Sequence, residues 1–206
     1  MKQLLDQLTA KHIIFDLDGT LIDSAPAILE SFRVACEECS VKTVVPLDAS
    51  LVGPPLMTTL EKVAGSPQFE VLEPLAAAFR NYYDNYGYTK TICFEDTPEV
   101  LRVLNRRGAS IYIATNKRKV PTDKIINMLG WRDYLSATYC LDTFDPPLQT
   151  KSQLLDRLLI ENALQPQSCV YIGDRLEDAR VAAANHLNFI RANWGYGTQE
   201  NFYQFC

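Results

Sequence analysis

The chain has 206 residues, of which 47% are hydrophobic, 22% charged and 10% aromatic, as in an ordinary globular protein. These proportions exclude a disordered chain and a collagen-like repeat. The formal net charge of -5 argues against a nucleic-acid partner, because such binding depends on positive charge facing the phosphates.

The sequence also predicts the cellular location of the protein. No apolar run is long enough to span a membrane, and residues 1–11 lack the apolar stretch of a secretory signal. Six scattered cysteines in a chain that builds its own core are typical of reduced thiols. We therefore expect a soluble cytoplasmic protein without a membrane partner, and both a monomer and a homodimer fit the sequence.

The first half of the chain predicts one strand followed by helices. Residues His12–Phe15 form a continuous apolar run, typical of a strand that is buried on both faces of a parallel sheet. From residue 24 to about residue 93 we expect helices only. Ser24 caps the first of them, and an apolar stripe over Leu72–Tyr86 predicts a long helix that ends at Gly87.

The second half of the chain alternates strand and helix signals. Thr97 occupies the position that caps a helix, and a further helical segment begins at Pro121 and stops at Gly130. The alternation predicts an α/β fold with a doubly wound, Rossmann-like parallel sheet. Three further strands are expected from the apolar runs Ala109–Ala114, Cys169–Ile172 and Asn188–Ala192.

Two parts of different character are therefore expected. The Rossmann-like core comprises residues 1–21 and 94–206, and residues 22–93 form an inserted, all-helical cap domain. Lids are commonly inserted where a substrate binds, so an insertion directly after the first strand predicts a lid over the ligand site.

Carboxylates gather where the predicted strands end. Asp16 and Asp18 follow the first strand, and Asp174 follows the strand at residues 169–172. The carboxyl ends of parallel strands line one crevice, so these side chains are expected to converge there, with Asp178 adding a fourth carboxylate. Acids so close together repel one another unless a cation is bound. Oxygen ligands without His or Cys select Mg²⁺ over zinc.

Residues suited to binding a phosphate lie at two further places. Thr115 and Asn116 follow a predicted strand and supply a hydroxyl, an amide and backbone N–H groups before a helix. Lys151, which follows the helix-capping residue Thr150, supplies a compact positive charge. A cation in the first turn opposes the helix dipole, a small cost that makes sense where an anion lies nearby.

These motifs occur in a recognisable order. DLDGT at residues 16–20, ATN at 114–116, Lys151 and GDRLED at 173–178 resemble the four motifs of the haloacid dehalogenase superfamily, and the match spans nearly the whole chain. The helical insertion, the turn at residues 52–56 and the sequence WGYG at 194–197 look most like the phosphoglycolate phosphatase branch. One position departs from the family pattern, because the lysine is frequently followed by proline and here Ser152 follows it.

The resemblance implies an Mg²⁺-dependent phosphomonoester hydrolase that acts through an aspartyl-phosphate on a small ester of the phosphoglycolate type. Asp16 would attack phosphorus, while Asp18 would protonate the leaving oxygen and then activate water. Asp18 would also offer its backbone carbonyl to the metal. Thr115 and Lys151 would bind the transferring phosphoryl group, which makes them catalytic residues beside Asp16 and Asp18. Together with the residue pattern, this gives Asp16, Asp18, Asp174 and Asp178 as metal ligands and Thr115, Asn116 and Lys151 as substrate-binding residues.

Several other functions fit parts of the pattern. A nucleotide 5'-phosphatase, a sugar-phosphate phosphatase and a phosphomutase would use the same core motifs. A true haloacid dehalogenase is disfavoured, because that chemistry needs neither the metal-binding carboxylates nor an acid two residues after the nucleophile. Among non-enzymes, a pseudophosphatase would lack at least one of the acids. A receiver-like signalling module would carry its phosphorylated Asp after a later strand and lack the long insertion.

Overall fold

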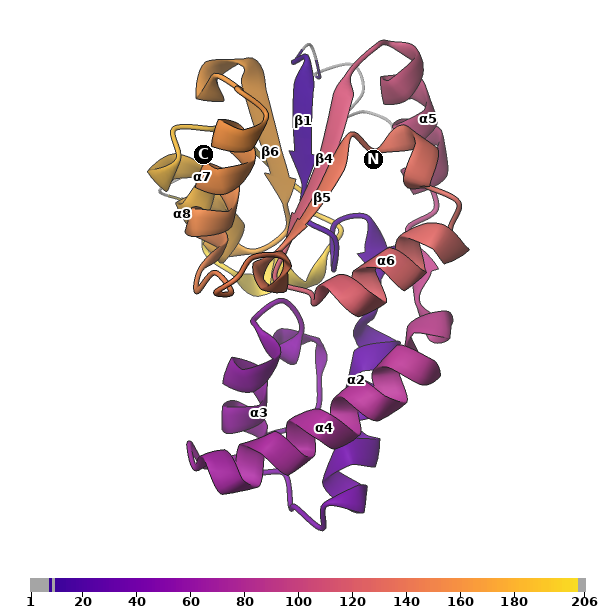
Figure 1. The fold of residues 1–206 in the computed structure, drawn as a ribbon, viewed down its shortest axis with the longest axis vertical. Coiled ribbons are helices and arrows are strands. Elements are labelled where there is room, and N and C mark those ends of the chain that lie inside the picture. Colours follow the sequence, from indigo (N-terminus) through magenta and orange to yellow (C-terminus); the bar gives the residue numbers. More distant parts are fainter. Residues whose placement is uncertain (1–7, 9, 204–206) are drawn as a thin grey trace.

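The computed structural model describes residues 8 and 10–203 (Figure 1). The expected lack of a secretory signal in residues 1–11 falls mostly outside these residues, and the predicted thiol of Cys206 falls entirely outside them. The five described cysteines are all free thiols, as expected. No helix within the described ranges has the length and apolar character needed to cross a membrane.

A parallel sheet forms the centre of the fold. Its strands are β1 (His12–Phe15), β4 (Ser110–Thr115), β5 (Ala137–Cys140), β6 (Cys169–Gly173) and β7 (Asn188–Arg191). All pairings are parallel and the order is β5-β4-β1-β6-β7, which puts β1 in the middle. The register places Phe15 beside Ile113 and Ile172, so the strands β1, β4 and β6 end at the same edge.

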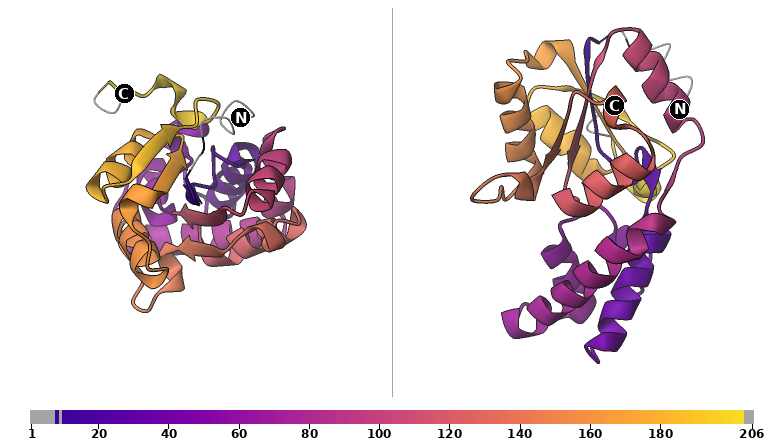
Figure 2. Two further views of the ribbon diagram at one scale, coloured as in Figure 1. Left: turned by 90° about the horizontal axis from the view of Figure 1, so that it is seen from above. Right: turned by 45° about the vertical axis from the view of Figure 1, so that its right-hand side comes forward.

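Helices cover both faces of this sheet (Figures 1 and 2). α5 (Thr97–Arg106) and α6 (Lys119–Met128) pack on one face, and α7 (Lys151–Glu161) and α8 (Leu176–Ala184) pack on the other. Side chains of β1 alternate between the faces, with Ile13 and Phe15 in one buried cluster and Ile14 in the other. The predicted doubly wound α/β fold is confirmed.

Residues 24–91, which lie between β1 and α5 in the chain, form a separate, mostly helical segment. It contains α2 (Ala25–Glu38), α3 (Leu56–Ala64) and α4 (Phe69–Asn85), which bury an apolar cluster of their own. In Figure 1 these helices lie beyond the carboxyl ends of β1 and β6. The proposed boundaries of a cap domain at residues 22–93 stay a prediction.

Two short strands connect this helical segment to the rest of the chain. β2 (Ile22–Asp23) and β3 (Ile92–Cys93) pair in antiparallel fashion, with Ile22 beside Cys93. The expectation of helices only up to about residue 93 is therefore wrong at β3. A strand of two residues is too short to produce a detectable pattern of apolar residues.

Two other local predictions need correction. Strand β5 was missed, because its sequence ATYC is short and contains Thr138, and its first two residues are only partly buried at the edge of the sheet. Thr97 does not cap α5, since Asp96 is the capping residue and Thr97 is the first residue of the helix. The Thr97 hydroxyl instead donates a hydrogen bond to the carbonyl oxygen of Leu21 at 3.0 Å.

Candidate active site

The central strand positions Asp16 directly. The backbone N–H of Asp16 donates to the carbonyl oxygen of Ile172 at 2.8 Å, so the pairing of β1 with β6 continues one residue past Phe15. The Asp16 carboxylate is buried, and one of its oxygens accepts from the backbone N–H of Leu17 at 2.8 Å. The other oxygen lies 2.8 Å from Nζ of Lys151.

Three buried carboxylates converge at this edge of the sheet. Asp16, Asp174 and Asp178 each offer one oxygen, and these oxygens lie within 4.8 Å of one another. Asp174 is held by the Thr20 hydroxyl at 3.3 Å and by the backbone N–H of Tyr196 at 2.7 Å. Buried carboxylates so close together repel one another, and a bound cation removes that repulsion. The donor set fits a hard divalent cation such as Mg²⁺.

Glycines leave the space that these carboxylates occupy. A Cβ on Gly19 or Gly195 would overlap the side chain of Asp174, and a Cβ on Gly173 would overlap that of Asp178. Gly19 also has φ of 81°, a conformation that side chains rarely allow. The glycines of the DLDGT, GDRLED and WGYG sequences therefore have a common role in packing backbone against the carboxylate cluster.

Burial changes the proton affinity of the cluster in the metal-free protein. Burial raises the pKa of Asp16 to about 8, because desolvation outweighs the opposing effect of the Lys151 ammonium, and the neighbouring carboxylates add to the rise. Burial likewise raises the pKa of Asp174 to about 6, with Asp178 adding to the rise. Without a cation, the cluster therefore holds protons that a metal would have to displace.

We expect Mg²⁺ to raise the melting temperature more at pH 8 than at pH 6. Asp16 keeps its proton up to about pH 8 in the metal-free folded state, against an ordinary value of 3.8. The folded state thus binds more protons than the unfolded state between these values, so stability falls as pH rises. Mg²⁺ replaces the proton and binds more tightly at the higher pH. Thermal unfolding in Mg²⁺ and in EDTA at both pH values measures this, and equal shifts would contradict it.

Lys151 lies between two of the three carboxylates. Its Nζ is 2.8 Å from Asp16 Oδ2 and 2.8 Å from Asp178 Oδ1, and its side chain is 3% exposed. As the sequence predicts, Lys151 is the first residue of α7, and the Thr150 hydroxyl caps that helix by accepting from the backbone N–H of Gln153. A buried ammonium is therefore held beside Asp16, where it can contact an anion.

Asp178 holds this lysine in place. Its Oδ1 accepts from the Tyr171 hydroxyl at 2.9 Å as well as from Lys151, and its Oδ2 accepts from the backbone N–H of Arg175 at 2.9 Å. Both oxygens of Asp178 thus have protein partners. Asp178 is therefore a member of the carboxylate cluster that also orients the ammonium group of Lys151.

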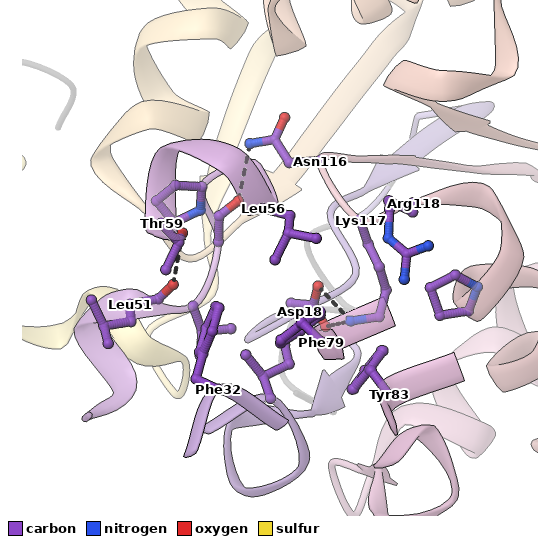
Figure 3. Close-up of a pocket in the computed structure, with 15 residues that line it drawn as sticks. Asp18, Phe32, Leu51, Leu56, Thr59, Phe79, Tyr83, Asn116, Lys117 and Arg118 are labelled. Carbon is purple, nitrogen blue, oxygen red and sulfur yellow. Dashed lines mark hydrogen bonds and ion pairs between the residues drawn. The ribbon is translucent and has the colours of Figure 1, made fainter. Parts of the chain in front are cut away.

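The Asp18 side chain lies beside Lys117 and Tyr83, on the side of the helical segment (Figure 3), and it is not one of the three carboxylates that converge. Its carboxylate accepts from the Ser24 hydroxyl, and it lies 2.9 and 3.1 Å from Nζ of Lys117. The structure therefore separates Asp18 from the three carboxylates with which the sequence pattern grouped it. An acid in this position is placed to exchange a proton with a group on the side of the helical segment.

Lys117 is the residue of this site that the sequence analysis missed. Its side chain is 5% exposed and its ammonium group lies 4.8 Å from the ring centre of Tyr83, as well as against Asp18. The sequence offered one signal, which is the position of Lys117 directly after Thr115 and Asn116.

The two residues before Lys117 have different surroundings. Thr115 ends β4 and is buried, and its hydroxyl accepts from the backbone N–H of Lys117 at 3.2 Å. Asn116 donates from Nδ2 to the carbonyl oxygen of Gly53 at 3.0 Å, which joins the edge of the sheet to the helical segment. Its Oδ1 is buried without a hydrogen-bond partner in the described structure. Thr115 thus stays at the strand end, while Asn116 reaches toward the helices.

Arg175 and Tyr196 make further contacts between the two parts. Nη2 of Arg175 donates to the carbonyl oxygens of Ala49 and Val52, at 2.8 and 2.5 Å. The Tyr196 hydroxyl donates to Asp23 at 2.8 Å and accepts from the backbone N–H groups at the start of α2. The candidate site therefore lies where the helical segment meets the end of the sheet.

Comparison with known proteins finds a matching family and several similar sequences. The sequence model of a family described as haloacid dehalogenase-like hydrolase matches residues 13–192. Tyrosine-protein kinase PtkA of Mycobacterium tuberculosis is 31% identical over 188 residues, which are 90% of this chain and 62% of PtkA. The chain thus spans less than two thirds of the length of that relative.

Other relatives match over most of their length. A 5'-nucleotidase of Pseudomonas aeruginosa is 29% identical over 192 residues, covering 92% of this chain and 85% of the relative. Phosphoglycolate phosphatases from several bacteria are 24–26% identical. Among solved structures, that of a predicted phosphatase from Clostridium acetobutylicum superimposes with a TM-score of 0.85 at 25% identity, covering 95% of this chain and 90% of the other.

Proposed function

Because this chain belongs to the haloacid dehalogenase-like hydrolase family, we propose that it is a phosphomonoester hydrolase that transfers a phosphoryl group first to Asp16 and then to water. The observation that carries the proposal is the position of Asp16. Its buried carboxylate ends the central strand, 2.8 Å from the Lys151 ammonium and beside the carboxylates of Asp174 and Asp178. Phosphoryl transfer needs this combination of an aligned nucleophile and nearby positive charge.

The first step forms a covalent intermediate on Asp16. A carboxylate oxygen of Asp16 attacks phosphorus, the bond from phosphorus to the ester oxygen breaks, and Asp18 gives its proton to that leaving oxygen. Lys151 and the Thr115 hydroxyl bind the oxygens of the transferring group. The alcohol then leaves on the side of Asp18, which faces the helical segment.

The second step returns the enzyme to its starting state. Asp18 takes a proton from a water molecule, whose oxygen attacks the phosphorus of the aspartyl-phosphate. The bond from phosphorus to Asp16 breaks, and inorganic phosphate leaves. One acid thus serves in turn as general acid and general base.

A divalent cation fits this chemistry. Asp16, Asp174 and the backbone carbonyl of Asp18 would hold Mg²⁺, with the Asp178 carboxylate beside them. When bound, the ion supplies positive charge that neutralises the phosphate oxygens and the carboxylates around Asp16.

The relatives support a small phosphate ester as the substrate. The phosphoglycolate-type ester predicted from the sequence has support from the phosphoglycolate phosphatases. The nucleotide alternative has support from the 5'-nucleotidase. A cytoplasmic location and the state of association, monomer or homodimer, stay predictions.

A trapping experiment tests the proposed function. We expect the protein to release inorganic phosphate from at least one ester in Mg²⁺ and to lose this activity in EDTA. Protein quenched in acid during turnover should gain one phosphoryl group on the peptide that contains Asp16, and hydroxylamine, which cleaves acyl phosphates, should remove it. Turnover without a labelled Asp16 peptide would argue for direct attack by water, and no release from any ester would argue against a phosphatase.

A further inference from the structure

Three sequence features to which the proposed reaction gives no role meet at one place in the structure. They are Arg175 in the sequence GDRLED, Tyr196 in the sequence WGYG and the start of the turn at residues 52–56. With the short helix η1 (Ala49–Leu51), the start of this turn forms the 49–54 loop, which lies between α3 and the carboxyl ends of the strands (Figure 1). The guanidinium carbon of Arg175 lies 5.9 Å from the ring centre of Tyr196, and Nη2 of Arg175 binds the loop.

Arg175 holds the backbone of the 49–54 loop. Its Nη2 donates to the carbonyl oxygens of Ala49 and Val52, at 2.8 and 2.5 Å. Gly53 lies against the same side chain, because a Cβ on Gly53 would be 3.4 Å from Nε of Arg175. Gly53 also has φ of 118°, a conformation that side chains rarely allow. The backbone of the loop is therefore shaped to lie on the guanidinium group.

Glu200 fixes the other terminal nitrogen of Arg175. Its Oε1 accepts from Nη1 of Arg175 at 2.9 Å, and its Oε2 accepts from the backbone N–H of Leu176, the first residue of α8. The Arg175 side chain is 13% exposed. Arginine suits this position because its planar group binds a carboxylate and carbonyl oxygens at the same time, which a lysine ammonium does less well.

Asn116 holds the same loop from a second strand end. Its Nδ2 donates to the carbonyl oxygen of Gly53 at 3.0 Å. Arg175 comes after β6 and Asn116 comes after β4, and these strands lie on either side of β1, whose end carries Asp16. The 49–54 loop is therefore held from both sides of the strand that positions Asp16.

The 49–54 loop forms one wall of the pocket that contains the phosphoryl site. Ser50, Gly53 and Pro54 line this pocket together with Asp16 and Lys151. None of these three loop residues has a charged side chain, so they bring no charge to a phosphoryl group. A closed loop instead excludes water, which strengthens the attraction between the Lys151 ammonium and the phosphate oxygens.

We infer that Arg175 is a positioning residue, which holds the 49–54 loop over Asp16 and Lys151 and so keeps the phosphoryl site closed. This inference rests on the proposed function and adds to it a residue that acts through the loop rather than on the ester. An ester binds productively to the closed form. A variant that releases the loop lowers the population of this form, so the apparent affinity for the ester falls by the same factor, whereas saturating ester restores closure.

The kinetics of Arg175→Met test this role. Methionine keeps much of the apolar stem and removes the groups that bind the loop. With 4-nitrophenyl phosphate in Mg²⁺, we expect KM to rise by roughly tenfold or more and kcat to stay within about threefold of the wild type. Loss of folded enzyme would instead lower kcat and leave KM unchanged. An unchanged KM would overturn the inference.

Arg191→Met is the matched control. Nη2 of Arg191 also donates to two backbone carbonyl oxygens, those of Gly197 at 2.9 Å and Thr198 at 3.4 Å, and both residues lie outside the helical segment. Loss of an arginine that holds backbone elsewhere should leave the KM of the wild type. An equal rise of KM in both variants would overturn a special role for Arg175.

Hydrogen exchange separates failure of this inference from failure of the proposed function, because it needs no turnover. We expect Arg175→Met to speed exchange in the peptide that contains the 49–54 loop by at least roughly tenfold, while peptides of β1 and β6 keep their rates. This result would support the inferred contact even if no ester were hydrolysed. Unchanged exchange in the loop would overturn the inference, and a raised KM beside it would mean that Arg175 contacts the ester itself. Faster exchange in all three peptides would also overturn it, because Arg175 would then hold the whole fold.

Discussion

Replacement of Asp16 by asparagine is expected to reduce phosphate release by roughly 10⁴-fold or more, the scale on which loss of a covalent nucleophile acts in other hydrolases. Asparagine has the shape of aspartate but its amide does not attack phosphorus. In the metal-free protein Asp16 keeps its proton up to about pH 8, so below that pH the substitution exchanges one uncharged side chain for another and leaves the pair of Lys151 with Asp178 in place. We therefore expect the metal-free variant to be at least as stable as the wild type, so that loss of activity reports chemistry rather than unfolding.

Asp18→Asn is the matched control, because it changes the other acid of the same loop. With 4-nitrophenyl phosphate the leaving group needs no protonation, so this variant should still form the phosphoenzyme and then stall before water attacks. We expect it to give a burst of one nitrophenolate per active site, measured by stopped-flow absorbance. Asp16→Asn should give no burst. A burst from Asp16→Asn would place the nucleophile elsewhere.

The three central strands of the sheet were predictable because they are buried on both faces. β1, β4 and β6 lie in the middle of the sheet, so each is a continuous apolar run that stands out from the amphipathic helices. β5 lies at the edge and mixes polar with apolar residues, so it gave no such signal. Burial on both faces made these three predictions possible, whereas the edge strand β7 was predicted from its short apolar run alone.

The sequence predicted the site residues that lie at the ends of strands. It did not predict the contacts between residues that are far apart in the sequence. Asp16 and Asp174 follow neighbouring strands, so the order of the sheet alone brings them together. The pairing of Asp18 with Lys117 joins residues 99 apart in the sequence. That of Asn116 with Gly53 joins residues 63 apart. Such contacts depend on where the helical segment packs, which no local pattern of residues specifies.

Lys151→Met is expected to lower the free energy of unfolding of the metal-free protein by about 3–5 kcal/mol, the cost of removing one partner from a buried ion pair. The ammonium lies 2.8 Å from both Asp16 and Asp178, and these side chains are 3%, 4% and 1% exposed. Urea unfolding measures the loss. Lys119→Met removes a lysine whose side chain is 51% exposed and 2.6 Å from Asp123, and should cost less than about 1 kcal/mol.

Adding Mg²⁺ separates the two roles proposed for Lys151, which are to neutralise the carboxylates and to bind the transferring phosphoryl group. An ion that binds only the folded state stabilises it and replaces the missing positive charge among the carboxylates, so Mg²⁺ should narrow the stability difference between Lys151→Met and the wild type. Phosphate release should nevertheless stay reduced by roughly 10²–10³-fold, because the ammonium that contacts the transferring oxygens is still missing. Recovery of both stability and activity in Mg²⁺ would mean that Lys151 only neutralises the carboxylates. Recovery of stability without recovery of activity would mean that the Lys151 ammonium also binds the transferring phosphoryl group.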